Sequence, residues 1–376
     1  MTNTTAESPT KDSSFVENRN QFAFDIFKVA NQKGSNTLLS PMSISTAFSM
    51  VYAGAKKETK AEMANVFRFS EKQSQQHKGF SQLLEKEDSS SYEIANAIWQ
   101  QKGYNITKKF IKTQTSYYKA SPHILDFAEK KKSIQTINNW IAEKTNNNIA
   151  DLVKENDVNK DTKLYLTNAI FFKSDWEKPF DSAKTYSGDF ETENNTKIKT
   201  DFMLNKGFYN SNFFKPSKSA AQVIELPYKG NRFSMLIIVP NKGVEISTLA
   251  DIQHYNSWIK DLQKNKFDAV HLPKFKLDID TDVREILESM GMKKAFSEEA
   301  NFSGISKQGD LMISDVKHQA KIKVDEKGTE AAASTAIGMA SRSAFKTVFM
   351  ANKTFLFIIK NNTNNNILFI GKFNND

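Results

Sequence analysis

A stretch of small side chains lies where a chain of this length should be completing its last strands. From Gly328 to Ala336 the sequence reads Gly-Thr-Glu-Ala-Ala-Ala-Ser-Thr-Ala, and two strongly apolar runs follow further on. Small side chains bury little apolar area, so this stretch cannot anchor a core. Taken alone, it is compatible with an Ala-rich helix or with a flexible loop.

The order of these side chains favours a segment that can become a strand. In a strand, side chains alternate between two faces, and here one face carries Thr329, Ala331, Ala333, Thr335, Ile337 and Met339. This face is small at first and apolar later. The segment can therefore stay in solvent as a loop, or enter an existing sheet without overpacking the residues beneath it. A bulky or charged residue at Thr329 would block entry.

Apolar periodicity elsewhere predicts helices early in the chain and strands later. Helical spacing covers residues 22–30, 44–52 and 134–141, with Ser133 placed to cap the third helix after the basic run 130–132. Strand patterns cover residues 164–172, 222–226 and 233–239, and an antiparallel hairpin is expected from the runs 353–359 and 366–373. This order indicates an α+β fold.

The chain of 376 residues is 39% hydrophobic, which suffices for a sizeable core. We expect a disordered polar lead over residues 1–14 and one large domain over residues 15–376, because neither a repeat nor a convincing linker interrupts the pattern. Neither a run of 18 apolar residues nor a signal peptide is visible.

The residue inventory argues against an enzyme. None of the five histidines lies in a hydrolase motif, and the absence of cysteine excludes thiolate nucleophiles and Cys-ligated metals, so we expect no cofactor. We also expect a monomer without nucleic-acid or membrane partners. The net charge of +9 leaves a polyanion such as a glycosaminoglycan open as a partner, although the basic residues near His77, Lys78 and Lys86 are too sparse to define a site.

Compartment is less constrained by the sequence. Six N-X-Ser/Thr acceptors favour an extracellular protein over a cytoplasmic one, and they lie at Asn3, Asn105, Asn194, Asn301, Asn352 and Asn361.

The run from Val324 to Ala333, Val-Asp-Glu-Lys-Gly-Thr-Glu-Ala-Ala-Ala, closely resembles the hinge of inhibitory serpins. Three further runs resemble the same family: Ser-Pro-Met-Ser-Ile-Ser over residues 40–45, Asn-Ala-Ile-Phe-Phe-Lys over 168–173 with Trp176 after it, and Leu-Phe-Ile-Gly-Lys-Phe over 368–373. One departure is Thr354, where the family usually has proline, and we expect it to loosen the chain slightly.

The resemblance implies a serpin fold with a central mixed β-sheet, further sheets, eight or nine helices and an exposed reactive-centre loop over about residues 327–348. It also implies suicide inhibition, in which a protease cleaves the loop and is trapped when the loop inserts into the main sheet. The family's common loop length, counted fourteen residues beyond Gly328, places the cleaved bond between Arg342 and Ser343. Arginine there predicts trypsin-like serine proteases as partners in a covalent complex.

Two alternatives stay open. The cleaved bond could lie at Met339, Phe345 or Lys346, and the protein could instead be a non-inhibitory serpin that acts as a carrier, chaperone or storage protein. The small face that begins at Thr329 favours inhibition.

The resemblance also assigns control residues. The hinge comprises Glu326, Gly328, Thr329, Glu330, Ala331, Ala332, Ala333, Ser334 and Thr335, and control of sheet opening falls to Ser43, Ser45, Asn168, His318, Trp176 and Lys274. Within these sets, His318 and Asn168 are expected to form a buried polar pair near Ser43 and Ser45. Glu326 and Lys274 are expected to form an exposed salt bridge that sets register.

Overall fold

The computed structural model describes residues 11–84, 92–120, 122–213, 220–313, 316–329 and 347–375. Within these ranges the helices are α1 (Lys11–Ala30), α2 (Pro41–Tyr52), α3 (Lys57–Phe67), α4 (Gln73–Leu84), α5 (Lys108–Tyr118), α6 (Lys130–Lys144), α7 (Ile246–Leu249), α8 (Ile252–Asp261) and α9 (Val283–Ser289), with 3-10 turns η1 (Ser182–Lys184) and η3 (Lys294–Phe296). No described helix is both long and apolar enough to cross a membrane.

The strands are β1 (Thr37–Leu39), β2 (Tyr92–Gln101), β3 (Pro122–Leu125), β4 (Leu164–Phe172), β5 (Ser174–Asp175), β6 (Tyr186–Glu191), β7 (Lys197–Ser211), β8 (Ala221–Pro227), β9 (Phe233–Pro240), β10 (Gln263–Pro273), β11 (Phe275–Asp282), β12 (Lys317–Val324), β13 (Gly328–Thr329), β14 (Val348–Met350), β15 (Phe355–Asn361) and β16 (Ile367–Phe373). The predicted α+β class is confirmed, as are the strands expected over 164–172, 222–226 and 233–239.

The largest sheet is mixed and has nine strands. Its order is β1-β16-β15-β9-β8-β7-β10-β14, with β6 paired to β7. Strands β10 and β14 run parallel to each other. Every residue of β9 is buried, as expected for an inner strand covered on both faces. The predicted C-terminal hairpin is β15 and β16, paired antiparallel from Phe355 and Phe373.

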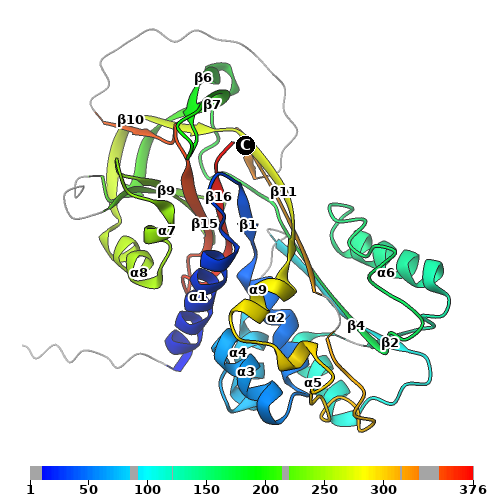
Figure 1. Ribbon diagram of the computed structural model, residues 1–376. Helices are drawn as coiled ribbons and strands as arrows, with labels where there is room; N and C mark the ends of the chain where they lie inside the picture. The colour runs from blue at the N-terminus through cyan, green and yellow to red at the C-terminus, as the bar shows by residue number, and fades with distance from the viewer. Residues whose placement is uncertain are drawn as a thin grey trace, which may run out of the picture.

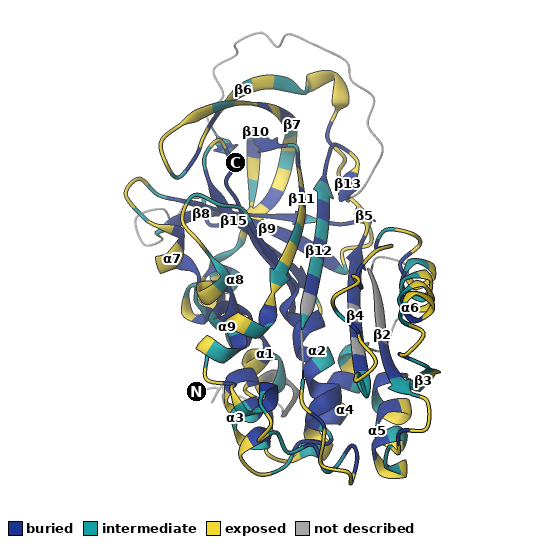
Figure 2. Cartoon of the chain, turned by 45° about the vertical axis from the view of Figure 1, so that its right-hand side comes forward, coloured by how far each residue is buried: buried dark blue, intermediate teal, exposed yellow. Residues whose placement is uncertain are grey.

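Two smaller sheets lie beside one another and face the same side of the molecule (Figure 2). One has four strands in the order β11-β12-β13-β5, and the other has three in the order β3-β2-β4. Strand β4 lies at the edge of the three-stranded sheet. Among the described strands, no hydrogen-bonded ladder joins β4 to β12.

The helices gather mainly at one end of the molecule, where α2 to α5 and α9 cluster, while α6 lies outside the β2–β4 pair (Figure 1). Helix α2 is buried on nearly all sides because its residues are small or apolar. It begins with Pro41, whose fixed φ suits a first helical position, and Ser40 caps it by accepting a hydrogen bond from the Ser43 N–H at 3.3 Å.

Two helix starts lie elsewhere than the sequence pattern suggested. Helix α1 begins at Lys11, inside the segment expected to be a disordered lead, and residues 1–10 lie outside the described part of the chain. Ser133 does not cap α6, because this helix begins at Lys130 and the Ser133 hydroxyl donates instead to the Asp126 carbonyl at 2.9 Å. The basic run is thus the first turn of the helix.

Thr354 fixes the start of β15 by hydrogen bonds, whereas we expected the chain to be looser there. Its N–H donates to the Glu191 carbonyl at 3.0 Å, a hydrogen bond that proline cannot make. Its buried hydroxyl donates to Asn374 Oδ1 at 2.7 Å. The departure from the family pattern therefore adds two hydrogen bonds at the start of β15.

Candidate functional site

The start of the hinge is already part of a sheet. Gly328 and Thr329 form β13, which pairs with β12 through Val324 and with β5 through Ser174 and Asp175, all antiparallel. A Cβ on Gly328 would lie 2.2 Å from the Ser174 carbonyl oxygen, so the close approach of β5 requires glycine here. The hinge is thereby held between two strands before any loop insertion.

An aromatic residue missed by the sequence analysis contacts the hinge. The hydroxyl groups of Tyr228 and Thr329 share a hydrogen bond of 2.7 Å, and both residues are buried. The Trp176 ring stacks on the Tyr228 ring with centroids 4.5 Å apart, and its indole N–H donates to the Asp325 carbonyl at 3.0 Å. Burial raises the pKa of Tyr228, which keeps its phenol protonated as a hydrogen-bonding group. No sequence pattern near Tyr228 predicts this contact, because Thr329 is 101 positions away in the chain.

The predicted ion pair at the hinge is present, but it is less exposed than expected. Lys274 Nζ lies 3.1 Å from Glu326 Oε2, and the side chain of Glu326 is only 9% exposed. Burial opposes ionisation of Glu326, yet hydrogen bonds from Thr185, from its own backbone and from Lys274 outweigh it, so the pKa of Glu326 is lowered. The Glu326 carboxylate therefore links Lys274, which lies between β10 and β11, to Thr185, which follows η1.

His318 lies on β12 and contacts the start of α2. Its Nε2 accepts a hydrogen bond from the Ser40 N–H at 3.0 Å, which assigns the proton to Nδ1 in the neutral ring. The expected neighbours Ser43 and Ser45 belong to the same helix, where Ser45 donates to the Met42 carbonyl. The described residues thus join His318 to Ser40, while the side chain of Asn168 in β4 lies outside the described part of the chain.

A groove separates the two smaller sheets. Its volume is about 490 Å³. It is lined from the β4 side by Phe171 and Phe172, from the β11–β12 side by Leu277 and Ile322, and also by Asn147. Figure 2 shows β13 and β5 above the adjacent strands β12 and β4. The groove and β13 therefore lie on the same line between β12 and β4.

The remaining predicted site residues lie outside the described part of the chain. This applies to hinge residues Glu330 to Thr335, to Arg342 and Ser343, and to the alternatives Met339, Phe345 and Lys346. Among the described residues, no group of three or more His, Asp or Glu side chains is placed to hold a metal ion.

The Tyr228–Thr329 hydrogen bond is expected to stabilise the hinge measurably. Tyr228→Phe removes the phenolic hydroxyl while keeping the stacked ring, and should lower the free energy of unfolding by about 1 kcal/mol. Tyr209→Phe is the matched control, because the Tyr209 hydroxyl is buried without a hydrogen-bond partner among the described residues. Urea unfolding midpoints measure both variants; an equal loss in both would contradict a specific role for Tyr228.

The buried His318 should make stability depend on pH. Burial lowers its pKa from 6.5 to about 4, so between these values the unfolded chain binds a proton that the folded protein excludes. Stability should therefore fall as pH falls through this window, by at most about 3 kcal/mol. His318→Gln keeps an acceptor for Ser40 and should flatten the dependence, whereas His77, whose pKa is also lowered to about 4, contributes equally in both proteins. Urea midpoints at several pH values test this, and identical slopes would refute it.

The family comparisons agree with this geometry. The family described as serpin (serine protease inhibitor) matches residues 17–376. Serpin B6 of Pongo abelii is 34% identical over 95% of this chain and 98% of its own length, and an uncharacterised serpin-like protein of Methanosarcina mazei is 36% identical over 94% and 85%. Among solved structures, Serpin48 of the insect Tenebrio molitor superposes with a TM-score of 0.83 at 28% identity, covering 98% of this chain and all of that one.

The expected serpin fold is thereby confirmed, with the helices, the mixed sheet and the further sheets described above, and the expectation that the protein is not an enzyme is also confirmed. Three observations support the same family. The predicted hinge starts as β13, a groove lies between β12 and β4, and the family match covers residues 17–376. The chain belongs to the serpin family of serine protease inhibitors.

Proposed function

We propose that the protein inhibits trypsin-like serine proteases by acting as a suicide substrate. The observation that carries this proposal is that β13 already stands between β12 and β5, directly in line with the groove between β12 and β4. A loop that continues downward from Thr329 would fill this groove as a new strand. It would join the four-stranded and three-stranded sheets into one.

The chemistry begins as ordinary proteolysis. The serine Oγ of the protease attacks the carbonyl carbon of Arg342, and an ester to Arg342 forms while the amine of Ser343 leaves with a proton from the catalytic histidine. The segment from Glu330 onward, released at its cleaved end, then enters the groove and carries the ester-linked protease along the sheet. Deacylation would fail because the protease is displaced before water attacks the ester.

The side chains of the hinge suit this movement. Thr329 is 1% exposed, so the first residue of the inserting face already fits against the interior. Ala331, Ala333 and Thr335 repeat the same small volume at alternate positions. Bulkier residues would overpack the layer beneath, as core insertions generally do.

Specificity would come from Arg342. Its guanidinium would pair with a carboxylate at the base of a trypsin-like pocket, and bidentate pairing of this kind is strong and directional. Met339, Phe345 and Lys346 are the alternative cleavage positions if the loop length differs from the common one.

Incubation with trypsin tests the proposal. A 1:1 complex that survives boiling in detergent should appear, together with a released C-terminal peptide. Trypsin whose active-site serine has been blocked by phenylmethylsulfonyl fluoride is the control and should give neither. Cleavage of the protein without any stable complex would favour the non-inhibitory alternative.

A further inference from the structure

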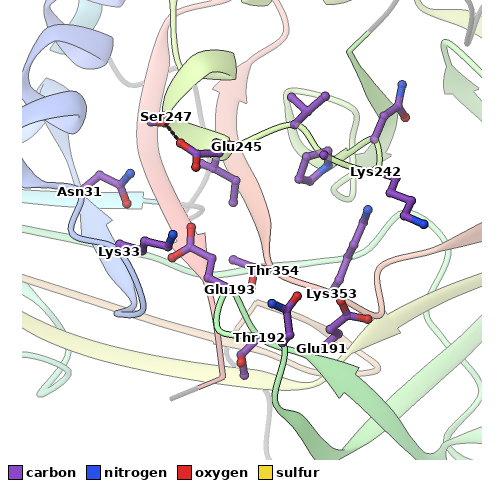
Figure 3. Close-up of a pocket in the computed structure, with 16 residues that line it drawn as sticks. Asn31, Lys33, Glu191, Thr192, Glu193, Lys242, Glu245, Ser247, Lys353 and Thr354 are labelled. Atoms are coloured by element: carbon purple, nitrogen blue, oxygen red, sulfur yellow. Dashed lines mark hydrogen bonds between the residues drawn. The ribbon is translucent and has the colours of Figure 1, made fainter.

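A pocket of about 610 Å³ lies at the start of β15, away from the hinge and the groove. Its walls come from the end of α1, the turn after β6, the segment between β9 and α7, and residues 353 and 354 (Figure 3). Thr354 lines it, and the hydrogen bond from Thr354 to Glu191 holds two of these walls together. Its volume is in the range typical of small-molecule sites.

The pocket has an excess of positive charge once the ion pair of one of its glutamates is taken into account. Three lysines, Lys33, Lys242 and Lys353, and three glutamates, Glu191, Glu193 and Glu245, line it. Glu193 is already neutralised, because its Oε2 accepts from the fully buried Lys372 at 2.8 Å and from the Gly34 N–H at 2.7 Å. Three lysines therefore face the two remaining carboxylates.

The surroundings of Lys353 disfavour its positive charge. Burial lowers the pKa of its ammonium group, and the attraction of Glu191 does not offset this effect. Among the described residues, neither Lys353 nor Lys242 has an acidic side chain within ion-pair distance. The two side chains come from different elements, Lys353 from the segment before β15 and Lys242 from the segment after β9 (Figure 3). A partly buried cation without a close counter-ion is costly, and an anion beside it would lower that cost.

The pocket also has an apolar wall and an unused acceptor. Pro240 and Ile246 are buried and Val244 is half-buried beside the segment that carries Lys242. Oδ1 of Asn31, which also lines the pocket, is buried and has no hydrogen-bond partner among the described residues. An apolar ligand body would lie against this wall, while an anionic head group, which has no proton to donate to Asn31 Oδ1, would lie at the lysines.

We infer that this pocket binds a small amphipathic organic anion, with its carboxylate at Lys353 and Lys242 and its apolar body against Pro240, Val244 and Ile246. This inference stands independently of protease inhibition. It assigns a ligand site to a part of the molecule whose lining residues differ from those of β13 and of the groove between β4 and β12.

Titration calorimetry with octanoate and with 1-octanol tests the inference, because the two probes share an apolar body and differ in charge. Octanoate should bind more tightly than 1-octanol to the intact protein, and acetate, which lacks the apolar body, should bind more weakly than octanoate. Lys353→Met should raise the Kd for octanoate about tenfold or more, the loss expected for one charge-assisted hydrogen bond, and leave 1-octanol unaffected. Lys264→Met is the matched control, since Lys264 is an exposed lysine on β10 outside the pocket.

Folding is checked by circular dichroism. If Lys353→Met does not fold, the same titration is made with Lys242→Met, which changes a lysine on the exposed segment after β9. This variant should also weaken octanoate binding. Equal binding of octanoate and 1-octanol, or unchanged octanoate binding in a folded lysine variant of the pocket, would overturn the inference.

Discussion

Thr329→Arg should abolish the covalent complex with trypsin and turn the protein into an ordinary substrate. Thr329 is 1% exposed, is paired on both sides in β13 and shares its hydroxyl with Tyr228, so a guanidinium has neither space nor an acidic partner there among the described contacts. The arginine would therefore displace the hinge from β13 before cleavage, so that insertion would have to bury the charge. Burying an unpaired charge costs several kcal/mol, and each 1.4 kcal/mol is a factor of ten. The ratio of trapped to cleaved molecules should therefore fall by about 100-fold or more.

Gel electrophoresis of trypsin reactions measures this ratio directly. Thr363→Arg is the matched control, because it places the same charge on an exposed turn between β15 and β16. Thr329→Val keeps the shape of the side chain and loses only the hydrogen bond to Tyr228, so it should still form complex. A Thr329→Arg protein that traps trypsin as well as the unmutated one would exclude insertion through β13.

Arg342→Glu should have the second large effect, on recognition and not on trapping. A pocket built to pair with a guanidinium rejects a side chain that cannot pair by about 10⁴-fold. The second-order rate constant for trypsin should fall by roughly 10³-fold or more, while Arg342→Lys should lower it by a much smaller factor, because lysine keeps the charge but cannot pair bidentately. Progress curves of trypsin activity provide the measurement.

The position of the cleaved bond needs a separate readout. Mass spectrometry of the peptide released by trypsin should give a fragment that begins at Ser343. Lys346→Ala is the matched variant, and it should leave both the fragment and the rate unchanged. A fragment beginning at Thr347, together with loss of inhibition in Lys346→Ala, would move the bond to Lys346 and refute the count from Gly328.

The octanoate pocket and the hinge are also separable in these experiments. The pocket lies at residues 353 and 354, whereas Thr329 of the hinge is hydrogen-bonded to Tyr228, on which Trp176 stacks. Lys353→Met should therefore leave trypsin trapping unchanged, and Thr329→Arg should leave octanoate binding unchanged.

Much of the fold was predictable because its signals are local. The apolar period of residues 44–52 identified α2, the continuous apolar run of residues 164–172 identified β4, and the two runs around residues 360–365 identified the C-terminal hairpin. The failures were local as well: Ser133 has the chemistry of a helix cap, but a hydrogen bond to Asp126 uses its hydroxyl inside the first turn.

The sequence alone identified the family and predicted the hinge, because side chains that are small at alternate positions leave a segment able to enter a sheet. Only the tertiary structure decided how the hinge is held. Tyr228 is hydrogen-bonded to Thr329, 101 positions away in the chain, and His318 to Ser40, 278 positions away. The separation of the strands into two smaller sheets leaves the groove between β4 and β12. Periodicity within a segment reports which face is buried and carries no information about which distant side chain will cover it, so these contacts had to come from the packed molecule.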